Sequence, residues 1–156
     1  MPVTHKSRAI SDRIAHLQGR EQPAHLLDWL ECFNAGEFYE AHDVLEDLWL
    51  EKRAEPVADF YQGLIQLAGA FVHLKMHEHP DYPAAGPRLR PAAKLLELAR
   101  SNLEAFNPAP HGFDQFATFE LISHWLALLK AGDFKTNPLV SEAPVRLIIQ
   151  TRASSK

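Results

Sequence analysis

A histidine and a carboxylate lie one helical turn apart in segment 37–52 of the chain. His42 is at the edge of an apolar stripe that recurs at helical spacing, and Glu46 is just beyond that edge. Imidazole and carboxylate together suit zinc, iron, nickel or manganese, and helix-bundle cores commonly hold such sites. The pattern predicts a site here, with Glu40 as the general base acting on a bound water.

A second helical segment, 57–77, has the expected partner face. It is apolar nearly everywhere, but Gln62, Gln66 and His73 share one side of it. Because buried polar groups are unfavourable unless they are paired, we expect the two polar faces to meet. We predict that His42, Glu46 and His73 ligate a metal, that Glu40 is catalytic, and that Gln62, Gln66 and Trp49 bind a ligand.

Two interpretations of this cluster stay open. In the first, the chain binds a divalent metal or a small ligand and is at most a metal-dependent hydrolase. In the second, it is a non-enzymatic interaction or scaffold bundle, and the polar groups only hydrogen-bond across the helices and fix their register. The glutamines favour the second interpretation, since amides are poor metal ligands but good members of a hydrogen-bond network.

Composition narrows the class of protein. The 156 residues fit one domain, and 46% hydrophobic with 23% charged residues is typical of a globular protein. A net charge of -4 argues against a nucleic-acid partner, which usually requires a basic surface. No apolar run is long enough for a membrane span and no signal peptide is evident, so we expect a cytoplasmic protein without a membrane partner.

Two further features have structural explanations. The single cysteine, Cys32, lies in a helical run and is expected to be a small buried hydrophobe. Three acidic residues, Asp43, Asp47 and Glu51, point away from the apolar stripe of their helix, and we expect them to form a solvated face.

The apolar periodicity predicts an all-α fold, a single compact bundle of about five long helices. The leader 1–23 contains a possible short helix over 11–17, the helical domain covers 24–135, and 136–156 is an irregular, proline-containing tail. Residues 145–149 of that tail are either an arm on the body or a docking segment for another subunit of a homo-oligomer. The expected long helices are 24–34, 37–52, 57–77, 92–106 after Pro91, and 115–131 after the N-cap Asp114.

The stretch FNAGEFYEAHDVLEDLW at 33–49, followed by QGLIQLA at 62–68 and by His73, closely resembles the domain-of-unknown-function family 309. The resemblance covers roughly residues 26–106 and implies a small all-helical fold with no agreed biochemical activity. The chain departs from the family after His73, where a longer proline-rich segment, 79–91, replaces a tight turn. The residues that match the family's polar signature are Glu40, His42, Glu46, Gln62, Gln66 and His73.

Overall fold

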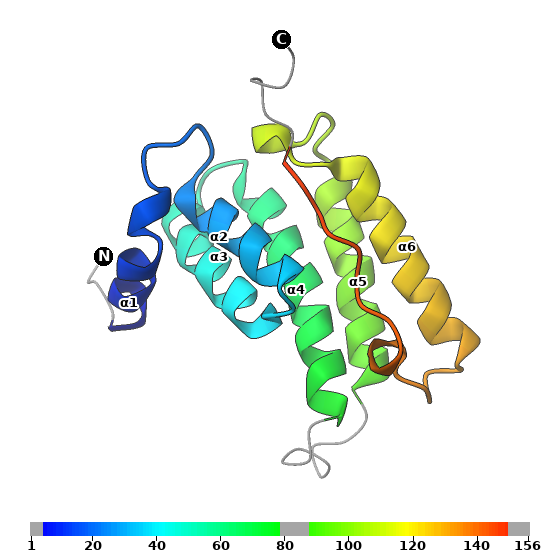
Figure 1. Ribbon diagram of the computed structural model, residues 1–156. Helices are drawn as coiled ribbons and strands as arrows, with labels where there is room; N and C mark the ends of the chain where they lie inside the picture. Colours follow the sequence, from blue (N-terminus) through cyan, green and yellow to red (C-terminus); the bar gives the residue numbers. More distant parts are fainter. Residues whose placement is uncertain (1–4, 79–87, 150–156) are drawn as a thin grey trace.

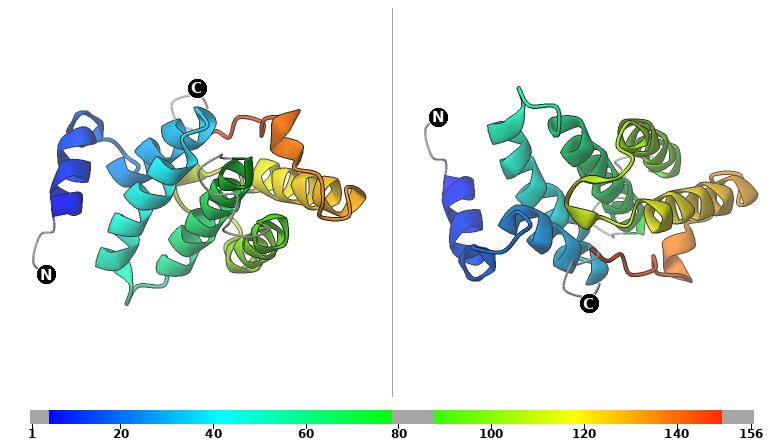
Figure 2. Two further views of the ribbon diagram at one scale, coloured as in Figure 1. Left: turned by 90° about the horizontal axis from the view of Figure 1, so that it is seen from below. Right: turned by 90° about the horizontal axis from the view of Figure 1, so that it is seen from above.

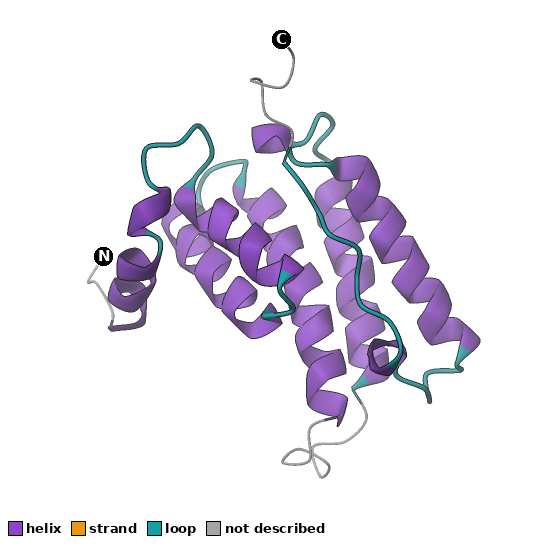
Figure 3. Ribbon diagram, in the orientation of Figure 1, coloured by secondary structure: helices purple, strands orange, loops and turns teal. Residues whose placement is uncertain are grey.

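The computed structural model describes residues 5–78 and 88–149, and the regular structure within these ranges is helical, with no strand (Figures 1 and 3). The all-α prediction is confirmed. The expected number of about five long helices is close, because a shorter sixth helix, α1, precedes them. The helices are α1 (His5–Arg13), α2 (Ala24–Asn34), α3 (Phe38–Lys52), α4 (Ala58–Glu78), α5 (Leu89–Glu104) and α6 (Gln115–Ala131).

Local signals in the sequence determine where several of these helices begin or end. Gly36 follows α2 with a φ of 79°, a left-handed conformation that favours glycine, and lets the chain turn directly into α3. The Asp114 side chain accepts a hydrogen bond from the amide of Ala117 and caps α6 as expected. Gly132 follows the last residue of α6. These boundaries are set by residues adjacent to the helices, so the sequence pattern predicts them well.

Two helices begin earlier than the sequence pattern predicts. The N-terminal helix is α1, which starts at His5, and Ser11 lies inside it instead of capping a helix over 11–17. Helix α5 starts at Leu89, so that Pro91 is its third residue. A proline is tolerated there because the amide groups of the first helical turn have no intrahelical partner. The rest of the expected proline-rich loop, 79–87, lies outside the described residues.

Helix α4 lies at the centre, with α3 packed on one side and α5 on the other (Figure 2). The aromatic core gathers around the fully buried Phe71 of α4. Its ring centroid lies 5.5 Å from that of Phe33, 5.0 Å from that of Phe38 and 4.8 Å from that of Trp125. Side chains of α2, α3, α4 and α6 therefore share one core.

The two ends of the described chain pack onto the same core. Ile10, Ile14 and Leu17 from the leader are buried, as is Leu147 from the tail. The amide side chain of Asn34 donates to the carbonyl of Leu147 at 2.8 Å and accepts from its N–H at 2.9 Å. The described part of the tail is therefore an arm on the body, which we call the strap (residues 141–149). The boundaries of the helical domain at 24 and 135 stay a prediction.

The expectation of a solvated acidic face was wrong for two of its three residues. Asp43 and Asp47 are only 17% and 15% exposed, because α1 and α2 cover them. Lys6 forms an ion pair with Asp43 at 3.1 Å, His25 contacts Asp47 at 2.8 Å, and the Ser7 hydroxyl also donates to Asp47. These two carboxylates therefore hold the leader and α2 against α3. The position of the leader could not be predicted from the sequence of α3 alone.

Candidate functional site

The polar residues of α4 form a stripe along the side of this helix that faces the gap between α3 and α5. Gln62, Gln66 and His73 are all partly buried there, and Gly69 lies between them. We call these four residues the polar stripe. The strap lies on another side of α4, next to Lys75, and reaches α2 at Asn34. Ribbon views from below and from above show the arrangement of these elements (Figure 2).

His42 of α3 approaches this stripe at its glycine. A Cβ atom placed on Gly69 would lie 3.7 Å from Cδ2 of His42 and 3.4 Å from Cδ1 of Leu95 in α5. The imidazole of His42 is 32% exposed, and its Nδ1 lies 3.4 Å from the carboxylate of Asp43. His42 of α3 therefore reaches α4 at Gly69, and its convergence with Glu46 and His73 on a ligand or metal stays a prediction.

Two polar residues of the stripe, Gln66 and His73, contact α5 or the residue before it. The Gln66 side-chain oxygen accepts a hydrogen bond of 2.7 Å from Asn102 in α5. Nδ1 of His73 lies 3.5 Å from the guanidinium of Arg88, the residue that precedes α5. Nδ1 of His77 accepts from the backbone N–H of Arg88 at 3.3 Å. The spacing of these two histidines also suits a metal. In the structure both side chains contact Arg88 and thereby connect the end of α4 to the start of α5.

The remaining predicted site residues are dispersed. Glu46 is 39% exposed and lies 3.9 Å from the ammonium of Lys6. Trp49 is half-buried, with the guanidinium of Arg53 at 5.2 Å from its ring centroid. Glu40 is exposed in the first turn of α3. Its role as a general base stays a prediction, as do the ligand-binding roles of Gln62 and Trp49.

Charge and burial determine whether these side chains can bind a metal and which hydrogen bonds His73 can make. Within the described ranges, no group of three or more His, Cys, Asp or Glu side chains is placed to hold a metal ion. Burial, followed by the positive charge of Arg88, lowers the pKa of His73. An arginine only donates hydrogen bonds, so Nδ1 of His73 is the acceptor in this contact and Nε2 carries the proton. His73 therefore presents an N–H donor, next to a fixed cation.

Cys32 is buried as expected, with 7% of its surface exposed. Burial raises the pKa of its thiol to about 12, and negative charges that include Asp28 and Glu40 add to this effect. Because the thiolate is the nucleophilic form, this thiol is unreactive at neutral pH. Catalysis by cysteine therefore has no support in the structure.

A loss of stability in mild acid follows from two histidines. Burial lowers the pKa of His111, whose Nε2 lies 3.0 Å from the hydroxyl of Tyr61, and the pKa of His73 is lowered as described above. The unfolded chain then binds more protons than the folded chain at pH values below the ordinary histidine pKa of 6.5. Their contribution to stability is complete above that pH and is lost as the pH falls through the lower folded-state values.

We therefore expect urea unfolding to give a smaller free energy of unfolding at a pH of about 5.5 than at about 7.5. The double variant His73→Gln, His111→Gln should have a flatter pH profile over this interval. The exposed His16, whose Nδ1 lies 3.1 Å from the carbonyl of Arg13, provides the matched control, and the slope of the double variant is compared with that of His16→Gln. An unaltered slope in the double variant would contradict the assignment.

Sequence reasoning missed the groups that contact the polar residues. Lys6, Arg88 and Asn102 are separated by many positions from the residues that they contact. Arg88 precedes α5 immediately only in the structure, because the sequence pattern predicted the start of this helix at residue 92. Nothing in the sequence indicates that Asn102 pairs with Gln66.

The fold and the polar stripe define a small all-helical domain whose central helix carries polar groups on one side. Residues 26–81 match the family DUF309, a domain of unknown function, and the resemblance is confirmed for this segment. The match includes most of α2 and all of α3 and α4 but not α5 or α6, so it is shorter than the resemblance expected from the motifs. No curated protein and no solved structure matched the chain. No helix among the described residues is long and apolar enough to cross a membrane.

Proposed function

We propose that this domain binds a small polar ligand on the polar stripe of α4, between α3 and α5. The stripe supplies amide and imidazole groups from three partly buried side chains, Gln62, Gln66 and His73. His42 and Leu95 flank it from the two neighbouring helices. A few convergent polar groups on a largely apolar surface are the usual composition of a ligand site.

The observation that carries this proposal is Gly69, a buried glycine inside α4 that faces His42 and Leu95. A glycine inside a helix lowers stability by roughly 0.5–1 kcal/mol relative to alanine. The contacts of 3.4 and 3.7 Å that a Cβ would make there are ordinary van der Waals distances, so helix packing does not require glycine at this position. We infer that glycine is present because the missing side chain leaves the surfaces of His42 and Leu95 that face this position uncovered for a ligand.

The groups around His73 indicate which chemical group of the ligand would bind there. The Nε2–H of His73 is a donor and the guanidinium of Arg88 is a cation, so a hydrogen-bond acceptor such as a carbonyl or a carboxylate fits best beside them. The same positive charge opposes a metal ion at His73. The predicted use of His73 as a metal ligand would require Arg88 to move away from Nδ1.

A divalent metal at His42 and Glu46 is the second candidate. These side chains are one helical turn apart and are 32% and 39% exposed, so both are accessible from solution. The ammonium of Lys6 already lies between the carboxylates of Asp43 and Glu46, at 3.1 and 3.9 Å. A bound cation would compete with this ammonium, whose own side chain is 54% exposed.

Both candidates are tested by amide chemical-shift mapping of the full chain. One titration uses small neutral and anionic carbonyl compounds and another uses Mn²⁺ as a paramagnetic probe. We expect carbonyl compounds to shift the amides of α4 around Gly69, and Gly69→Leu to abolish these shifts by filling the face. If Mn²⁺ binds, it should broaden resonances near His42, and Lys6→Ala should strengthen this effect.

The matched controls are His42→Ala for the metal and His16→Ala for a histidine outside the site. Shifts that survive Gly69→Leu, or that lie away from α4, would contradict the ligand proposal. Broadening that persists in His42→Ala would contradict the metal candidate. A chain that responds to neither probe would favour the interpretation of the stripe as a purely structural network.

A further inference from the structure

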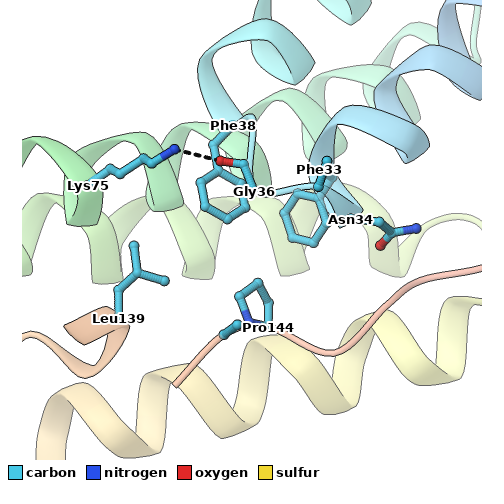
Figure 4. A pocket seen from close by; sticks show the side chains of 9 residues that line it. Phe33, Asn34, Gly36, Phe38, Lys75, Leu139 and Pro144 are labelled. Atoms are coloured by element: carbon cyan, nitrogen blue, oxygen red, sulfur yellow. Dashed lines mark hydrogen bonds between the residues drawn. The ribbon is translucent and has the colours of Figure 1, made fainter. Parts of the chain in front are cut away.

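A cavity lies on a different face of α4 from the polar stripe, beneath the start of the strap (Figure 4). Its volume is about 310 Å³, at the lower end of the range of small-molecule sites. The α2–α3 turn provides one wall, α4 the second, and the strap with the turn before it the third. The side chains that matter here are Phe33, Phe38, Lys75, Leu139 and Pro144.

The strap and the turn before it are anchored on the two sides of this cavity, and this explains why the cavity is not filled. On one side the buried Asn137 donates to the carbonyl of Leu74 at 2.7 Å. On the other side the side chain of Asn34 makes both of its hydrogen bonds to the backbone of Leu147. Residues 141–143 between these anchors are exposed. The two anchors fix the length of the arch, so its middle spans the hollow instead of collapsing into it.

The side chains of the walls are apolar except for Lys75 and Asn34, and the Asn34 amide is already bonded to the backbone of Leu147. The rings of Phe33 and Phe38 lie on one side, with Leu139 and Pro144 opposite them (Figure 4). The ammonium of Lys75 donates to the carbonyl of Gly36 at 2.8 Å and lies 5.7 Å from the centroid of the Phe38 ring. An ammonium has three N–H donors, and none of the described carboxylates forms an ion pair with this one. Lys75 therefore has donors available at the rim of an aromatic hollow.

We propose that this cavity binds a small aromatic monocarboxylate. The ring lies among Phe33, Phe38, Leu139 and Pro144, where aromatic pairs and apolar burial stabilise it. The carboxylate accepts hydrogen bonds from Lys75, which supplies the complementary charge. This site is separate from the polar stripe and does not depend on the function proposed for it.

The test compares a charged probe with its neutral isostere. Calorimetric titration of the full chain with 2-naphthoate and with 2-naphthamide should show that the acid binds about threefold to tenfold more tightly, as expected for one partly exposed ion pair with hydrogen bonds. Lys75→Met keeps the length of the side chain and removes the charge. This variant should bind the acid only as well as the amide, with no change in affinity for the amide.

Two further variants distinguish the cavity from a general effect of charge or folding. Lys130→Met removes an exposed ammonium from α6, outside the cavity, and should leave both affinities unchanged. Leu139→Trp fills the cavity from the turn before the strap and should abolish binding of both probes while the helical circular dichroism is retained. The proposal is overturned by equal affinities for acid and amide, by no saturable binding up to about 5 mM, or by an equal loss of binding in Lys130→Met.

Discussion

Replacement of Phe71 by alanine is expected to lower the free energy of unfolding by about 3–5 kcal/mol. Phe71 is fully buried, and its ring contacts three aromatic rings that come from α2, α3 and α6. Truncation removes apolar burial and leaves a cavity where four helices meet, and the surrounding rings are too large to close it. Urea unfolding followed by far-UV circular dichroism measures this loss.

The control for Phe71 is another phenylalanine of the same chain. Phe116 at the start of α6 is 76% exposed, so Phe116→Ala should change the free energy of unfolding by less than about 0.5 kcal/mol. A loss below about 2 kcal/mol for Phe71→Ala would mean that the aromatic cluster is not the centre of the core. Equal losses in the two variants would lead to the same conclusion.

Two glycines of α4 are expected to respond to alanine in opposite directions. A Cβ on Gly63 would lie 2.9 Å from Cγ of the buried Leu103 and 3.3 Å from the carbonyl oxygen of Ala99. Gly63→Ala therefore overpacks the contact between α4 and α5 and should lower the free energy of unfolding by about 1–3 kcal/mol. At Gly69 there is room for a methyl group, so Gly69→Ala should raise it by about 0.5–1 kcal/mol.

The two variants carry the same chemical change in the same helix, so each controls for the other. Their free energies of unfolding should be compared by urea titration under identical conditions. A loss of stability in Gly69→Ala would show that packing, and not an open binding face, requires glycine at that position. A neutral Gly63→Ala would show that Leu103 and the backbone of α5 move aside easily.

The sequence alone determined the helical class and most helix boundaries. Helices α2 and α6 begin and end at the predicted residues, because glycine and an N-capping aspartate act on the adjacent turn. The burial of Cys32 and the polar edge of α3 also follow from local periodicity, since a helix places residues three and four apart on one face.

Only the tertiary structure decided which groups these polar residues contact. Gln66 pairs with Asn102, His73 with Arg88, and Glu46 with Lys6, and each partner lies on another helix or immediately before one. Periodicity predicts the face on which a side chain lies but not the element that packs against that face. The strap and its cavity follow the same rule, because Asn34 and Leu147 are separated by 113 positions in the chain and meet only in the folded molecule.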